Sequence, residues 1–289
     1  MAKLDVVGCL PSKLLGLQRD MLEKWSGPDG ELWVERIALT LQGKNPLEAV
    51  VKGPAWADEV VAQARRKLKK FFGRLQVDPV PGVWTPEFLE NAAKYNMHPV
   101  YFIDLVLAKD WSLKNYTKQE SWLYEKIREG KISADAVTLK RRWCLADFSV
   151  GVDYTDGSQV FPNDPWAPII EKLRRDLRVI GKYDNTPCGS RFAITPKEWD
   201  DVVLAYMASA LRVTRAQTCL ERAGEFNFIG NVYDPNRGRF NMWEWFRDPF
   251  GGSDRLYGGY RRYGGLAGVG CVSSDDRYDG IAGRPLVSF

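Results

Sequence analysis

The chain has 289 residues, of which 45% are hydrophobic and 27% are charged. Lysine and arginine number 41 against 37 aspartates and glutamates, and the resulting net charge of +4 is too small for a dedicated nucleic-acid-binding protein. Aromatic residues make up 12% of the chain, including 11 tryptophans, and this apolar area excludes a disordered protein.

No run of residues approaches the ~18 apolar positions of a membrane span. The segment from Met1 to Cys9 is too short and too interrupted for a secretory signal. These features predict a protein that is cytoplasmic or associated with a virus particle.

The cysteines and the single histidine indicate no reactive centre. The five cysteines are scattered and form no Cys-x-x-Cys pair, so we expect neither a disulfide framework nor a zinc site. His98 precedes a proline, which favours extended backbone at the boundary of an element. We therefore predict no catalytic residue, no metal and no cofactor.

The first half of the chain has the apolar periodicity of short helices. Helices are predicted over residues 11–25, 32–41, 54–75, 85–95, 118–128 and 132–142. The polar face of the third carries a basic run from Arg65 to Lys70, which is typical of a solvated face and would also suit phosphate or an acidic partner. We expect this helical region to occupy residues 1–142.

From Trp143 onward, short apolar pieces alternate with turn clusters, which indicates an α+β fold. Helices are predicted over residues 166–177 and over residues 195–223, where Thr195-Pro196-Lys197-Glu198 forms a capping sequence. Beyond Glu225 there is no long periodic segment, so we expect loops held by aromatic side chains and one buried strand within residues 266–272.

Three short motifs follow one another near the end of the chain. They are Phe240-Asn241-Met242-Trp243-Glu244-Trp245, then Arg247-Asp248 with Gly251-Gly252-Ser253, and finally Ile281-Ala282-Gly283-Arg284. Together with an upstream helix from Ile194 to Trp199, they resemble the formylglycine-generating-enzyme type of the C-type lectin fold. The resemblance implies a C-type-lectin-like domain over residues 143–289, with short strands, two helices and long loops.

The sequence departs from that family in places that bear on activity. Phe240 stands for a glycine, Asp254 stands for a tryptophan, and the last motif is altered from Ile-Gly-Phe-Arg. The sulfatase-activating members use a pair of reactive cysteines, whereas Cys271 stands alone, and one thiol cannot reproduce a two-thiol site. An oxidoreductase of this type is the alternative interpretation, and it would need Cys219 or Cys188 close to Cys271.

The other branch of this fold is the variable protein of diversity-generating retroelements. There a reverse transcriptase randomises adenines, typically in AAY codons for asparagine. The resulting NNY codons never encode Lys, Glu, Gln, Trp or Met. Residues 249–289 contain none of these five residue types. The resemblance therefore implies a non-enzymatic, ligand-binding protein of a phage, an archaeal virus or a bacterial or archaeal host. Its variable region would span about residues 250–284.

The composition of this region suits a selectable binding surface, because tyrosine gives a large contact area with few rotatable bonds while serine and glycine adapt. The predicted ligand-facing residues are Asp254, Arg255, Tyr257, Tyr260, Arg262, Tyr263, Gly270, Ser273, Ser274, Asp276, Tyr278 and Asp279. The predicted scaffold residues are Trp243, Trp245, Gly251, Gly252 and Arg284, with the tryptophans as a floor beneath the site and the glycines in tight turns.

The expected partner is a protein or another surface ligand. Two alternatives stay open: a glycine-rich loop that only covers the surface, and a segment that stacks on single-stranded nucleic acid. Four aspartates in the same stretch argue against a polyanion, namely Asp254, Asp275, Asp276 and Asp279.

Overall fold

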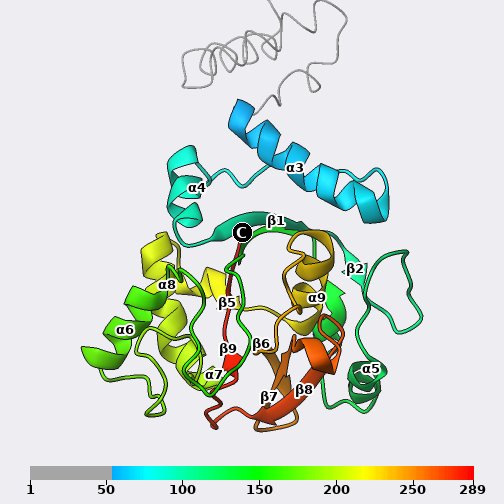
Figure 1. Ribbon diagram of the computed structural model, residues 1–289. Coiled ribbons are helices and arrows are strands. Elements are labelled where there is room, and N and C mark those ends of the chain that lie inside the picture. Colours follow the sequence, from blue (N-terminus) through cyan, green and yellow to red (C-terminus); the bar gives the residue numbers. More distant parts are fainter. Residues whose placement is uncertain (1–53) are drawn as a thin grey trace, which may run out of the picture. The chain divides into compact units, whose positions relative to one another are not determined.

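The computed structural model describes residues 54–289, and the helices predicted over residues 11–25 and 32–41 lie outside them. Residues Glu59–Phe289 form one compact unit (Figure 1). This unit mixes helices and strands, which confirms the predicted α+β class.

The helices are α3 (Ala55–Phe72), α4 (Pro86–Ala93), α5 (Ser121–Arg128), α6 (Ala167–Arg175), α7 (Pro196–Glu198), α8 (Leu204–Leu211) and α9 (Ala223–Val232). The strands are β1 (Met97–Phe102), β2 (Leu105–Val106), β3 (Thr138–Leu139), β4 (Arg142–Asp147), β5 (Thr218–Leu220), β6 (Trp243–Phe250), β7 (Asp254–Gly258), β8 (Val269–Ser273), β9 (Ile281–Ala282) and β10 (Pro285–Ser288). Among these residues, no helix is both long and apolar enough to cross a bilayer.

Helices α3, α4, α5 and α6 confirm the predictions for their segments. The start of α4 shows the local cause: Thr85 accepts a hydrogen bond from the Phe88 amide at 3.1 Å, and Pro86 occupies the first turn. At α7, the Thr195 side chain accepts from the Glu198 amide at 3.1 Å while the Glu198 carboxylate accepts from the Thr195 amide at 2.8 Å. This is the capping box that the sequence predicted.

Two helix predictions were too long. Within residues 132–142 only a short 3₁₀ turn forms, at Ala134–Val137, before the chain enters β3 and β4. The helix that begins at Pro196 continues through a π-helical turn, Trp199–Val203, and ends at Leu211 rather than near residue 223. Arg212 stops it by adopting a left-handed conformation with φ of 59°.

The expectation of loops beyond Glu225 was wrong, because α9 and three longer strands lie there. Nine of the ten residues of α9 are buried. A helix that is covered on all sides lacks the apolar stripe from which a surface helix is predicted. The strand expected within residues 266–272 is β8, but the expectation that it is buried was wrong, because it lies at the edge of its sheet and only Val269 of its residues is buried.

The first sheet has the strand order β1-β4-β10-β5, with all neighbours antiparallel. Strand β1 pairs with β4 from Met97↔Asp147 to Phe102↔Arg142, so the sheet joins both sides of the division we expected at residue 142. The short apolar run of β1 carries too little periodicity to distinguish it from the helices around it.

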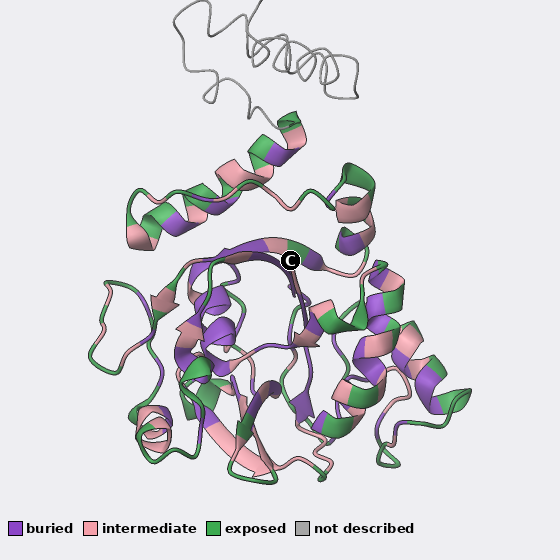
Figure 2. Cartoon of the chain, turned by 180° about the vertical axis from the view of Figure 1, so that it is seen from behind, coloured by how far each residue is buried: buried purple, intermediate pink, exposed green. Residues whose placement is uncertain are grey.

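The C-terminal strand β10 lies inside this sheet, where Leu286 pairs with Ala146 of β4 on one side and with Cys219 of β5 on the other. Helix α9 packs nearby, with the Phe228 ring centroid 5.5 Å from that of Phe102. Figure 2 shows buried residues concentrated on the first sheet and on α9, while the outer helices expose much of their surface.

The second sheet has the order β8-β7-β6-β9, with β9 parallel to β6 and the other pairs antiparallel. It lies at the opposite end of the unit from β1 (Figure 1). Only Gly283 and Arg284 separate β9 from β10, so the last residues connect the two sheets. A side chain at Gly283 would lie 2.4 Å from the buried ring of Trp199, so this connection needs a glycine.

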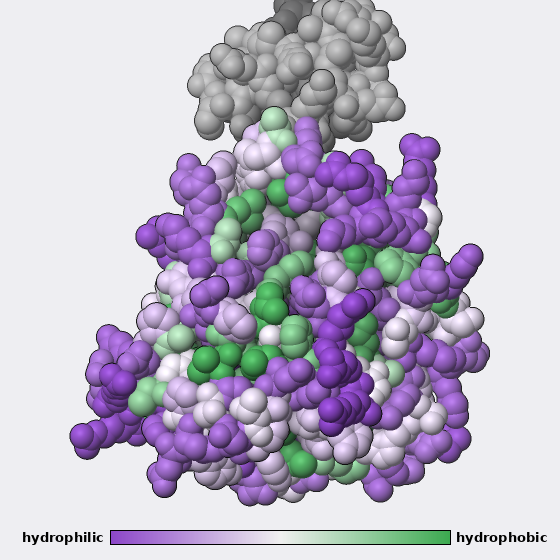
Figure 3. All heavy atoms as spheres, viewed as in Figure 1, coloured by the Kyte–Doolittle hydropathy of each residue, from purple (hydrophilic) through white to green (hydrophobic). Residues whose placement is uncertain are grey.

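Buried ion pairs hold the interior. The pairs are Arg191 with Asp147 and Asp164, Arg237 with Glu221 and Asp234, and Arg284 with Glu244. The guanidinium groups of Arg191 and Arg284 also lie 4.6 and 4.9 Å from the centroid of the Phe161 ring. On the face drawn in Figure 3 the surface is mostly hydrophilic, with apolar side chains showing near the middle, as is usual for a folded domain.

Candidate ligand-binding site

Strands β6 and β7 place aromatic side chains on one face of the second sheet. Trp245 pairs with Tyr257 across the two strands, and Trp243 lies two residues before Trp245, on the same face. The Trp243 and Tyr257 ring centroids are 4.8 Å apart at an interplanar angle of 85°. Strand pairing therefore fixes the first wall of a cavity.

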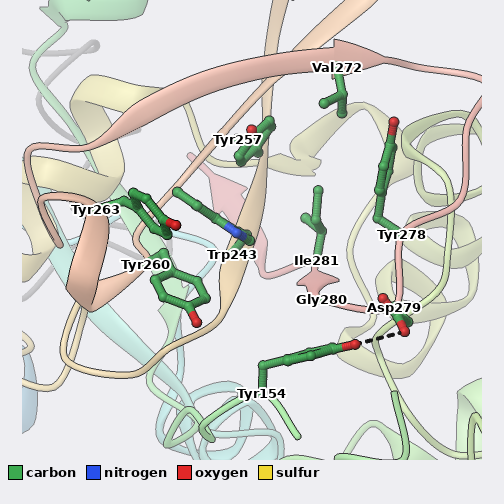
Figure 4. A pocket seen from close by; sticks show the side chains of 10 residues that line it. All are labelled: Tyr154, Trp243, Tyr257, Tyr260, Tyr263, Val272, Tyr278, Asp279, Gly280 and Ile281. Carbon is green, nitrogen blue, oxygen red and sulfur yellow. Dashed lines mark hydrogen bonds between the residues drawn. The ribbon is translucent and has the colours of Figure 1, made fainter. Parts of the chain in front are cut away.

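The cavity has a volume of about 350 Å³ and opens to solvent. Figure 4 shows the side chains that line it. Its lining residues are Tyr154, Trp243, Tyr257, Tyr260, Tyr263, Val272, Tyr278, Asp279, Gly280 and Ile281. Six of these ten side chains are aromatic. This volume is at the lower end of the ~300–1,000 Å³ range of small-molecule sites.

The loop between β7 and β8 extends the aromatic wall. Tyr260 and Tyr263 flank Trp243, with ring centroids at 4.9 and 5.6 Å, and Tyr263 is nearly parallel to the indole at 23°. Figure 4 shows Tyr278 facing this cluster from the other side, while Tyr154 and Asp279 lie along a third side. The Tyr154 hydroxyl donates a hydrogen bond to the Asp279 carboxylate at 3.1 Å.

A second hollow of about 660 Å³ shares three of these residues, namely Trp243, Tyr257 and Tyr263. Glu120 and Gly270 lie on its other sides. The aromatic cluster therefore borders both hollows, so a ligand larger than a small molecule could contact both.

The structure brings together about half of the predicted ligand-facing residues. Five of the twelve line the first cavity: Tyr257, Tyr260, Tyr263, Tyr278 and Asp279. Gly270 lines the second hollow. None of the twelve is buried, and Arg262, Tyr263 and Asp276 are exposed.

The other predicted residues lie outside both hollows. Arg255 forms an ion pair with Asp200 at 2.7 Å and also donates a hydrogen bond to the Arg247 carbonyl. Its side chain is therefore bound within the protein. The Ser274 hydroxyl donates to the Ser253 carbonyl at 2.6 Å, where the ends of β7 and β8 meet. The remaining ones are Asp254, Arg262, Ser273 and Asp276.

The predicted scaffold residues differ in their exposure. Trp245 is 1% exposed and donates a hydrogen bond from Nε1 to the Ile194 carbonyl at 3.1 Å, so it lies beneath the site. Trp243 is only half-buried and lines the cavity itself. Gly251 adopts φ of 57° beside Gly252 in the exposed turn between β6 and β7. Arg284 is buried against Glu244 at 2.9 Å.

Sequence reasoning missed four lining residues, Tyr154, Val272, Gly280 and Ile281. Tyr154 belongs to a distant loop, which reaches the site because its amide donates to the Asn241 carbonyl at 2.9 Å. A tyrosine in a turn cluster was the only available signal for it. The other three lie within or next to the stretch that was predicted to be variable.

The described cysteines, Cys144, Cys188, Cys219 and Cys271, are all free thiols. Cys271 lies on β8 of the second sheet, whereas Cys219 lies on β5 of the first, and both are free thiols. Burial raises the pKa of the Cys219 thiol to about 11 and that of Cys144 to about 12, and it also raises that of Cys271. Thiols with raised pKa values stay protonated and are poor nucleophiles.

Within residues 54–289, no group of three or more histidine, cysteine, aspartate or glutamate side chains is arranged to hold a metal ion. Comparisons of the chain with protein-family models, with curated proteins and with solved structures found no match.

The backbone conformation of the loop that carries Tyr260 and Tyr263 should require a glycine at position 268. A Cβ at this position would lie 1.8 Å from the Tyr263 carbonyl oxygen, a backbone atom that cannot rotate away. We expect Gly268→Ala to lower the free energy of unfolding by about 1–3 kcal/mol, as overpacking does. Chemical denaturation measures this. The control is Gly252→Ala, where no atom lies within 4 Å; equal losses in both variants would contradict the prediction.

Proposed function

We propose that the chain is a non-enzymatic, ligand-binding variable protein. Its C-terminal part would be a C-type-lectin-like scaffold diversified by a retroelement, and its exchangeable side chains would contact a protein or another surface ligand. The observation that carries this proposal is the convergence of Tyr257, Tyr260, Tyr263 and Tyr278 around one solvent-open cavity. Tyrosine clusters of this kind are typical of selected binding surfaces.

The distribution of burial supports a division between a fixed frame and an exchangeable surface. The residues beneath the cavity are buried and held by specific contacts, such as Trp245 against Ile194 and Arg284 against Glu244. The tyrosines above them are half-buried or exposed. A rigid backbone that carries exposed aromatic side chains lowers the entropy cost of binding, because little reorganises when the ligand arrives.

The proposal predicts that the surface tyrosines can be exchanged without loss of the fold. We expect Tyr260→Ser and Tyr278→Ser each to lower the free energy of unfolding by roughly 1 kcal/mol or less, since each residue keeps part of its surface in water. Thermal melts of the two variants measure this. Collapse of folding in most such variants would show that these side chains are core residues and would end the proposal.

A functional test uses a display library randomised at Tyr257, Tyr260, Tyr263 and Tyr278. Selection against several unrelated proteins should return a different set of side chains for each target on one unchanged scaffold. A matched library randomised at surface positions of α3, such as Arg65, Arg66 and Lys69, should return no binders. Equal yields from the two libraries would contradict the proposal.

The retroelement part has its own test in the genome that encodes the chain. We expect a near-copy of the coding stretch for residues 250–284 that differs mainly at adenines and lies beside a reverse-transcriptase gene. A genomic neighbourhood without these two elements would remove the diversification claim.

A further inference from the structure

The cavity combines aromatic walls with one acidic group. Six of its ten lining residues are tyrosine or tryptophan, Asp279 is the one acidic residue, and none of the lining residues is basic. The faces of aromatic rings carry partial negative charge and attract cations, with tryptophan the strongest. Trp243 borders this cavity with Tyr257, Tyr260 and Tyr263 packed around it.

The Asp279 carboxylate is held in place at the edge of this aromatic wall. It accepts a hydrogen bond from the Tyr154 hydroxyl, and the Asp279 carbonyl accepts another from the Gln159 side chain. No lysine or arginine in residues 54–289 forms an ion pair with it. Its negative charge is therefore not neutralised by a described basic side chain.

The nearest arginine along the chain is already paired elsewhere. The Arg277 guanidinium binds both oxygens of the Glu198 carboxylate, at 2.7 and 2.9 Å, and also donates to the Ala193 carbonyl. Burial raises the pKa values of the Tyr154, Tyr257 and Tyr278 hydroxyls above the ordinary value of tyrosine, so these three groups add no charge. Near pH 7 the lining is thus aromatic and neutral except for one carboxylate.

We infer that this cavity binds a methylated ammonium group, such as that of choline or of a trimethylated lysine side chain. The inference deepens the proposed function, on which it rests only for the location of the binding surface. The methyl groups would contact the aromatic walls and the positive charge would face Asp279. A neutral sugar or an apolar group would also stack on the rings, but neither would neutralise the negative charge of the Asp279 carboxylate.

The test titrates the full chain with choline and with 3,3-dimethyl-1-butanol, its neutral carbon isostere, by isothermal titration calorimetry. The two probes have nearly the same shape, so any difference between their affinities is due to the positive charge of choline. We expect choline to bind at least about tenfold more tightly. Equal affinities for the two probes, or no detectable binding of choline, would overturn the inference.

Two variants locate the effect. Asp279→Asn keeps the shape of the side chain and should weaken choline binding about tenfold while leaving any weak binding of the isostere unchanged. The matched control is Asp275→Asn, because Asp275 is exposed and lies outside the cavity; it should bind choline like the unmodified chain. Unchanged choline affinity in Asp279→Asn would also overturn the inference.

The outcomes for ligand class and for proposed function are separable. If choline fails to bind while Tyr260→Ser and Tyr278→Ser stay folded, the binding surface stands and only the cationic ligand is rejected. If those two variants unfold, the proposed function fails whatever the choline titration gives.

Discussion

Arg191→Ala is expected to lower the free energy of unfolding by about 3–5 kcal/mol. The Arg191 side chain is fully buried and binds Asp147 and, at 2.6 Å, Asp164. Its removal would leave two buried carboxylates without their positive partner, and unpaired buried charge is among the most costly defects in a protein interior. Urea denaturation measures the loss.

The control for this variant is Arg175→Ala. Arg175 pairs with Glu171 at 2.8 Å on α6, but its side chain is 64% exposed, so we expect little change in the free energy of unfolding. Similar losses in the two variants would show that burial does not determine the strength of these ion pairs.

The defect in Arg191→Ala should also depend on pH. Burial alone would raise the pKa of Asp147, but Arg191 and Arg284 outweigh it and hold this pKa below its usual value. The unmodified chain therefore keeps this contribution above the unfolded pKa of ~3.9 and loses it as the pH falls through the lower folded pKa. Without Arg191, protonation of Asp147 relieves the unpaired charge. Because burial raises the pKa of a carboxylate that has lost its partner, the difference in stability between the two proteins should begin to shrink above the unfolded pKa of ~3.9 and shrink further as the pH falls through it.

Trp245→Ala is expected to lower the free energy of unfolding by about 3–5 kcal/mol, because the indole is 1% exposed and its loss leaves a cavity. The same change removes the support beneath the site, since the Trp245 ring centroid lies 6.2 Å from that of Tyr257 and 6.1 Å from that of Tyr278. Stability is measured by denaturation, and choline affinity by calorimetry at a temperature where the variant is folded.

Trp245→Phe serves as the control because it keeps an aromatic ring but removes the hydrogen bond to the Ile194 carbonyl. We expect it to lose about 1–2 kcal/mol, the range for a buried acceptor left unsatisfied. A small loss in Trp245→Ala, comparable with that of Tyr260→Ser, would contradict the division between a fixed frame and an exchangeable surface.

The helices that were predicted well are those whose signals lie within a few residues of each other. Thr85 with Pro86, and Thr195 with Glu198, satisfy the free amides at helix starts, and their chemistry is legible in the sequence. The sequence did not indicate the end of the helix that begins at Pro196, because an arginine in a left-handed conformation terminates it rather than a glycine.

Helix α9 and strand β10 escaped prediction for a different reason. Both are buried among other elements, so neither shows the alternation of apolar and polar residues that marks a surface helix or an edge strand. The pairing of β10 with both β4 and β5 joins residues far apart in the chain, such as Leu286 with Ala146. Such partners are decided by the whole fold.

The sequence by itself determined the composition of the site, a stretch rich in tyrosine, glycine and aspartate. The tertiary structure alone decided which of these residues meet. Tyr154 reaches Asp279 across 125 positions of the chain, and strand pairing sets Tyr257 beside Trp243. The physical reason is range: capping and periodicity act over a few residues, whereas a cavity depends on contacts between distant segments.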